Sequence, residues 1–193
     1  MEQKLSLYQN IKEYYLNKIY EQKFINQKSY IIEDIVDLIS IRKYQIKKSE
    51  IKQDGVFPVV DQGKETIAGY FDDESKVFKD VPIIIYGDHT TNLKYMEKPF
   101  IVGGDGVKLL KLNNNMDLKY IYYAFISNNI NSEGYKRHFS IFKNKEIGIT
   151  EDIKKQNKIG NLFYSMDILL NIMKNKIKIL KRYKQGLLQR MFV

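Results

Sequence analysis

Residues 176–192 read KIKILKRYKQGLLQRMF, and residues 4–20, KLSLYQNIKEYYLNKIY, align with them without a gap. The matched positions include Leu5 with Ile177, Tyr8 with Leu180, Lys12 with Lys184, Tyr15 with Leu187 and Ile19 with Met191. Two amphipathic helices can look alike by chance, but nearly every apolar site is retained here. The match therefore indicates a repeated segment, which is typical of a modular, ruler-like architecture.

The longer context of the second copy predicts one long helix. From about Glu151 to Met191 the apolar residues follow a 3.5-residue repeat without a proline, which predicts a helix in coiled-coil-type packing. A second apolar face lies outside that repeat, so we expect more than one partner. The residues expected at a dimer or partner interface are Leu5, Tyr8, Phe163, Met166, Leu170, Ile172, Met173, Ile177, Leu180 and Leu187.

The composition limits the class of protein. A chain of 193 residues accommodates one domain of ordinary size and an extended helical element. It contains no Cys and two His, which excludes disulfides and a structural zinc site made from these residue types alone. No run of about 18 apolar residues and no secretory signal is evident, so we expect a cytoplasmic protein without a membrane span.

The positive charge is concentrated near the C-terminus. The segment from Lys154 to Val193 holds ten Lys/Arg and one acid, Asp167, whereas residues 1–153 hold 22 of each sign. The whole net charge of +9 therefore lies on the C-terminal segment. Such a helix can follow a phosphate backbone through counterion release, or can present an ordinary solvated face.

Residues 29–150 change to short apolar runs broken by Gly, Asp and Asn, which are typical of strands and tight turns. Val81–Tyr86 is predicted to be a buried strand, Lys108–Leu112 an alternating strand, and Asp117–Ser127 a helix. We predict an α+β fold: one mixed α/β domain with coiled-coil-type helical arms. The expected domains are an N-terminal helical arm at 1–24, the mixed α/β domain at 25–150 and a long C-terminal helix at 151–193.

Catalytic patterns are weak. Asp61, Glu74 and Lys76 match the loose spacing of a restriction-type nuclease core, in which two carboxylates hold a divalent metal and a lysine orients water. Acidic turns such as 72–74 often arise by chance. No phosphate-binding glycine loop or nucleophile elbow is present in the sequence. We interpret the chain as non-catalytic and as having no metal site, and keep the nuclease as an alternative.

DNA-binding patterns are denser. Short polar side chains at 87–92 are of a kind that reaches base edges, although Asp88 and Thr90 can instead bond their own backbone. The segment 135–143 interleaves basic and aromatic residues, with Arg137 suited to guanine or phosphate. The turn at Gly103–Gly106 is interpreted as structural. The predicted DNA-binding residues are Lys64, Thr66, Tyr70, His89, Thr90, Thr91, Asn92, Lys94, Lys136, Arg137, His138 and Lys143.

Three stretches resemble the specificity (S) subunits of type I restriction-modification systems: FPVVDQGKETIAGYF, VPIIIYGDHTTNLKYMEKPFIVGGDGVKLLKL and KIKILKRYKQGLLQRMF. The resemblance covers essentially the whole chain. Members of that family normally carry two target recognition domains and long helices, so this chain resembles a half-size form with one such domain. Where the family has a proline-rich PLPPLxEQ step before the last helix, this sequence retains the Gln as Gln156 and lacks the prolines.

The resemblance implies a subunit without catalysis of its own. It implies binding to a half-site of double-stranded DNA and docking of a DNA methyltransferase subunit and a restriction/translocase subunit. No cofactor is expected in this chain, because S-adenosylmethionine is brought by the methyltransferase. A homodimer is expected. A helical adaptor that binds only protein is a further alternative.

Overall fold

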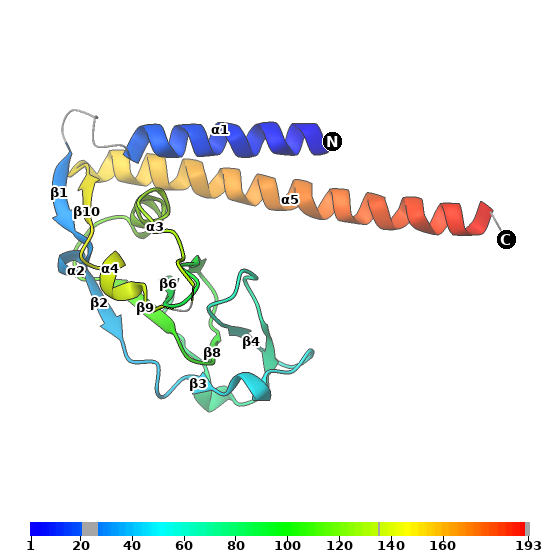
Figure 1. Ribbon diagram of the computed structural model, residues 1–193, viewed down its shortest axis with the longest axis horizontal. Helices are drawn as coiled ribbons and strands as arrows, with labels where there is room; N and C mark the ends of the chain where they lie inside the picture. The colour runs from blue at the N-terminus through cyan, green and yellow to red at the C-terminus, as the bar shows by residue number, and fades with distance from the viewer. Residues whose placement is uncertain (21–26, 135, 192–193) are drawn as a thin grey trace.

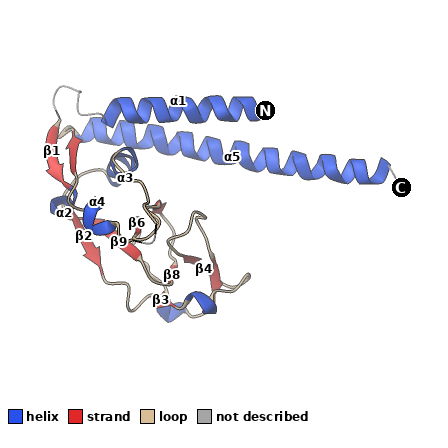
Figure 2. Cartoon of the chain, viewed as in Figure 1, coloured by secondary structure: helices blue, strands red, loops and turns tan. Residues whose placement is uncertain are grey.

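The computed structural model describes residues 1–20, 27–134 and 136–191. Two helices lie side by side along one edge of the molecule, and a domain of short strands lies beneath them (Figure 1). Helices and strands are mixed through this domain (Figure 2). The predicted α+β fold with long helical arms is confirmed. The boundary predicted at residue 24, together with Tyr135 and Phe192, lies outside the described residues.

The two long helices are α1 (Glu2–Tyr20) and α5 (Ile153–Met191), and they run antiparallel. Their contacts fix the register. Glu2 pairs with Lys181 at 2.5 Å, Lys12 pairs with Asp167 at 2.5 Å, and the Tyr20 and Phe163 rings lie 6.3 Å apart. The C-terminal part of α5 continues past the start of α1 (Figure 1).

The start of α5 is held by two polar side chains. Asp152 accepts hydrogen bonds from the backbone N–H groups of Lys154 and Lys155, at 3.0 and 3.2 Å, and so caps the first turn. Gln156 is buried, accepts from the N–H of Asp117 at 2.8 Å and donates to the carbonyl of Thr150 at 2.6 Å. Gln156 therefore ties α5 to the domain without the prolines of the family pattern.

The domain contains two four-stranded sheets. The first has the antiparallel order β2 (Val36–Ile39), β9 (Val107–Leu112), β6 (Ile83–Gly87), β7 (Leu93–Met96). The second has the order β3 (Gln45–Ile46), β8 (Ile101–Gly103), β4 (Phe57–Val60), β5 (Gly69–Phe71), with β8 parallel to both of its neighbours. The predicted strands at 81–86 and 108–112 correspond to β6 and β9.

Short elements complete the domain. β1 (Lys28–Ile31) pairs antiparallel with β10 (Glu146–Ile149), joining the two ends of the domain. The others are the short helices α2 (Ile32–Ile35) and α4 (Phe139–Phe142) and the 3-10 turns η1 (Lys48–Glu50) and η2 (Glu74–Lys76). None of the helices in the described ranges is both long and apolar enough to cross a membrane.

α3 (Leu118–Ser127) joins the arms to the first sheet. It begins as predicted, with the Asp117 side chain accepting from the N–H of Tyr120 at 2.7 Å. Tyr20 of α1 donates to the Tyr120 carbonyl at 2.9 Å, and Phe163 of α5 packs against Tyr123. One apolar core therefore spans α1, α3, α5 and the sheet.

The burial of Phe163 and Leu170 contradicts their prediction as interface residues. Phe163 is fully buried in the chain's own core, and Leu170, at 7% exposure, is buried as well. The antiparallel packing of α1 along this part of α5 accounts for this. Neither side chain is therefore available to a partner. By contrast, Ile172, Leu180 and Leu187 are 58%, 47% and 44% exposed.

Candidate nucleic-acid interface

Two open hollows meet at the turn between β8 and β9. The first has a volume of about 670 Å³ and the second about 520 Å³, and Asp105 lines both. The first is lined by Arg42, Gln45, Ile46, Lys47, Lys48, Glu50, Asp61, Gln62, Gly103, Gly104 and Asp105. The second is lined by Asp88, His89, Asp105, Gly106, Lys108 and Arg137. We call these the β3 hollow and the β9 hollow.

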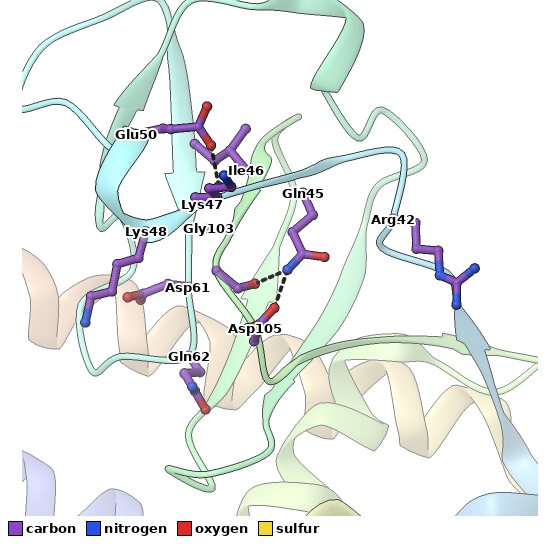
Figure 3. A pocket seen from close by; sticks show the side chains of 11 residues that line it. Arg42, Gln45, Ile46, Lys47, Lys48, Glu50, Asp61, Gln62, Gly103 and Asp105 are labelled. Carbon is purple, nitrogen blue, oxygen red and sulfur yellow. Dashed lines mark hydrogen bonds between the residues drawn. The ribbon is translucent and has the colours of Figure 1, made fainter.

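Cationic side chains lie on both sides of the turn. In the β3 hollow, Arg42 and Lys48 lie on either side of Gln45 and Asp105 (Figure 3). In the β9 hollow, Lys108 and Arg137 contribute two more cations. Such a row can neutralise phosphates on both flanks of a duplex groove, with polar side chains between them.

The turn itself requires glycine. Gly104 and Gly106 have φ values of 77° and 76°, a region that side chains with a Cβ rarely adopt. A Cβ at Gly106 would also lie 2.8 Å from Oε1 of Gln62 and 2.9 Å from the His89 ring. The structural interpretation of 103–106 is confirmed, and the turn also carries Asp105 to the edge of both hollows.

Arg137, Lys136 and His89, all predicted to bind DNA, lie together. Nδ1 of His89 lies 3.0 Å from the Lys136 carbonyl, and both His89 and Arg137 line the β9 hollow. Arg137 and Lys136 are exposed. The loop from Gly87 and the segment around residue 137 therefore converge on one surface.

His138 does not face this surface. It is buried, and its Nε2 accepts from the N–H of Glu133 at 3.0 Å, so the proton resides on Nδ1. That Nδ1–H faces the Asp88 carbonyl at 3.1 Å. With both ring nitrogens engaged inside the domain, His138 supports the fold, which corrects its prediction as a DNA contact.

Lys94 is likewise internal. It is 6% exposed, and its Nζ donates to the carbonyls of Asp61 and Glu65 at 2.7 and 2.5 Å and lies 3.6 Å from the Asp61 carboxylate. Burial lowers the pKa of Lys94, while Asp61 partly offsets this. Lys94 therefore anchors the loop after β4 to β7, and its prediction as a DNA contact is corrected.

Thr90, Thr91 and Asn92 mostly bond within the chain. Thr90 and Asn92 both donate to the carbonyl of Gln62, and Thr91 is buried with a φ of 57°. The side chains of Thr90 and Asn92 therefore tie this loop to the loop at Gln62, which differs from the alternative in which Asp88 and Thr90 bond their own backbone.

The remaining predicted residues are dispersed. Lys64 and Thr66 line a hollow of about 340 Å³ that they share with Lys12 and Asp167 of the arms. Lys143 pairs with Glu33 at 2.6 Å. Tyr70 lies in β5 and, like Lys143, does not line the β3 or β9 hollow.

The nuclease pattern does not assemble. Asp61 faces Lys94 and accepts from the N–H of Gly63 at 2.8 Å, whereas Glu74 pairs with Lys79 at 2.8 Å. Within the ranges that the structure describes, no group of three or more His, Asp or Glu is placed to hold a metal ion.

The chain is similar to known proteins in its structure. No protein-family profile and no curated protein sequence matches the chain. Among solved structures, the type I restriction-modification S subunit from M. genitalium matches with a TM-score of 0.64 and 20% identity, over 84% of this chain and 44% of the other. The HsdS subunit from Thermoanaerobacter tengcongensis matches with a TM-score of 0.59 and 10% identity, over 91% and 47%.

A structure titled for complex assembly and conformational transition of the type I R-M system matches with a TM-score of 0.61 and 10% identity, over 96% of this chain and 51% of the other. The chain has the S-subunit fold. It spans about half the length of the S-subunit structures that it matches.

Sequence reasoning missed most of the β3 hollow. The signal was present in RKYQIKK at 42–48, where four cations and Gln45 occur within seven residues. The parallel pairing of β3 with β8, which brings this segment beside the turn at 103–106, could not be predicted from the sequence. In this chain, residues 42–48 and the turn at 103–106 form one surface although they are far apart in the sequence.

Proposed function

We propose that this chain is a non-catalytic DNA-specificity subunit that recognises a half-site of duplex DNA. One observation supports this most strongly: a domain with the S-subunit fold carries the β3 and β9 hollows side by side, lined by Arg42, Lys47, Lys48 and Arg137, and by Lys108, which is paired with Asp88. A pair of cation-lined hollows meeting at a polar turn suits a duplex, whose phosphates flank the base edges.

The long helices are proposed as the docking surface for the subunits that act on DNA. We infer that α5 binds a methyltransferase subunit, which supplies S-adenosylmethionine, and that a restriction/translocase subunit joins the complex. Ile168, Ile172 and Ile179 of α5 are 47%, 58% and 64% exposed, and α1 leaves this face uncovered. Apolar side chains at this spacing suit a partner helix.

The first test measures duplex binding of the full chain against salt concentration. Arg42→Ala and Arg137→Ala are each expected to weaken binding to all sequences and to lower the slope of log K against log salt by about 1. Lys178→Ala, which removes an exposed charge from α5, serves as the matched control and is expected to leave the slope unchanged. A slope lowered by Lys178→Ala alone would place the DNA on the arms instead.

The second test measures assembly. The full chain is mixed with the methyltransferase subunit of a type I system, and complex formation is followed by sedimentation. Ile172→Asp is expected to lower the affinity at least tenfold because it places a charge in an apolar contact. Val56→Asp, at a 71% exposed site before β4, is the control. Equal assembly by both variants would remove the docking role of this face.

A further inference from the structure

Asp105 and Glu50 line the hollows without an ion pair among the described residues, and of these two acids Asp105 is the one that lines both hollows. Three other acids lining them are committed to the chain: Glu50 to the N–H of Lys47 at 2.6 Å, Asp61 to Lys94 at 3.6 Å, and Asp88 to Lys108 at 3.6 Å. The ion pairs found within the described ranges include none for Asp105, which is exposed. Its charge is therefore directed outward.

The carboxylate is held in a defined orientation. Nε2 of Gln45 donates to Oδ1 of Asp105 at 2.7 Å and to the Gly104 carbonyl at 3.1 Å (Figure 3). The N–H of Gly104 donates to the Ile46 carbonyl at 2.9 Å, which fixes the turn against β3. These contacts use Oδ1 and leave Oδ2 for a donor from outside the chain.

A carboxylate does not bind phosphate, because both groups are anions. The cations that line the hollows beside Asp105, Arg42 and Arg137, are the side chains suited to phosphate. The donors that DNA offers in the major groove are the exocyclic amino groups of cytosine (N4) and adenine (N6). We propose that Asp105 is a specificity-determining residue that accepts a hydrogen bond from one of these amino groups in the major groove. This inference rests on the proposed DNA-binding function.

Gln62 supplies a second polar group next to the turn. Its Oε1 accepts from the backbone N–H of His89 at 3.0 Å, and because that N–H can only donate, the assignment of O and N in the amide is fixed. Its Nε2 is thereby kept as a donor close to Gly106. A donor near an acceptor is the complement of the N7/N6 edge of adenine, so adenine is the favoured base.

The experiment selects binding sites from random duplexes with three full-length proteins. The wild type is expected to select a motif with adenine or cytosine at one defined position. Asp105→Asn keeps an acceptor for Gln45 but presents an amino donor, so it is expected to lose that preference tenfold or more and to favour guanine or thymine there. The rest of the motif is expected to stay the same. Asp37 is an exposed acid in β2, and Asp37→Asn is the control for the lost charge.

A second arm identifies the contacted atom. The selected duplex is synthesised with a base that lacks only the exocyclic amino group, purine in place of adenine or 2-pyrimidinone in place of cytosine. The wild type is expected to lose tenfold or more in affinity for the modified duplex, whereas Asp105→Asn is expected to bind both duplexes equally. Which of the two modified bases has this effect distinguishes adenine from cytosine.

The outcomes separate the two proposals. If the wild type selects a motif and Asp105→Asn selects the same one, the role of Asp105 is refuted and DNA recognition stands. If Asp105→Asn loses the preference at every position of the motif at once, the role of Asp105 is to stabilise the turn at 103–106. That result also refutes a hydrogen bond from Asp105 to a base. If the wild type shows no sequence preference, the proposed function itself fails.

Discussion

At the scale of single residues, identical side-chain types have opposite roles. Lys94 and Lys136 were both predicted to bind DNA, yet Lys94 is buried with three oxygen partners and Lys136 is 65% exposed. His138 is buried like Lys94, whereas His89 is half-buried, contacts the Lys136 carbonyl and lines the β9 hollow. A basic or polar residue in a sequence identifies a possible contact, but its burial decides whether it binds another molecule or its own chain.

Lys94→Met is expected to lower the free energy of unfolding by about 2–3 kcal/mol, because the Asp61 and Glu65 carbonyls and the Asp61 carboxylate would lose their shared donor. Urea unfolding of the full chain measures this. Lys98→Met, at an exposed position four residues later, is the control and is expected to change stability by less than about 0.5 kcal/mol. Equal effects at both positions would show that the Lys94 contacts contribute nothing.

At the scale of helices, α5 contains two glycines in different environments. A Cβ at Gly160 would lie 2.7 Å from the backbone N of Tyr120 and 2.5 Å from a carboxylate oxygen of Asp117, because α3 begins there. Among the described residues, none outside the helix itself lies within 4 Å of a Cβ at Gly186. The first glycine permits close packing of two helices, and the second has no such contact.

The two alanine substitutions are expected to change the free energy of unfolding in opposite directions. Gly186→Ala is expected to stabilise the helix by up to about 1 kcal/mol through helix propensity alone. Gly160→Ala is expected to destabilise the chain in spite of that gain, because α3 must move away from α5. Helix content and the thermal midpoint of each variant test this. Stabilisation by both substitutions would mean that α3 and α5 do not approach as closely as described.

The sequence predicted the elements better than their contacts. The helices α1, α3 and α5 and the buried strand β6 follow from local patterns that act within a few residues. The pairing of β1 with β10 joins residues more than a hundred positions apart, and no local pattern specifies it. The same limit hid the β3 hollow, since Gln45 meets Asp105 only through the pairing of β3 with β8.

At the scale of the whole molecule, the helices leave an apolar surface uncovered. Leu180, Leu187 and Met191, near the end of α5, are 47%, 44% and 74% exposed. The start of α1 reaches Lys181, so Leu180 lies at the edge of the covered part of α5, and Leu187 and Met191 lie beyond it. The homodimer remains a proposal, and this part of α5 is its expected contact surface.

Self-association at micromolar concentration is expected in sedimentation experiments. Leu180→Asp combined with Leu187→Asp is expected to yield a monomer with unchanged unfolding, because neither side chain is buried in the chain. Substitution of Leu170, which is buried, would instead perturb the fold. Val56→Asp is the control for an added charge. A wild type that sediments as a monomer at all concentrations would contradict the dimer.

The pairing of β1 with β10 has a consequence for how this molecule can change. Lys28 lies opposite Ile149, and Ile31 lies opposite Glu146, so the chain enters and leaves the domain through one hydrogen-bonded ladder. Ends held this close make the domain an insert between α1 and α5, and α3 is the part of the insert that packs on both helices. One contiguous stretch with closely spaced ends could therefore replace another if the contacts of α3 with the two helices are kept, and under the proposed function such an exchange is expected to change the DNA sequence preference.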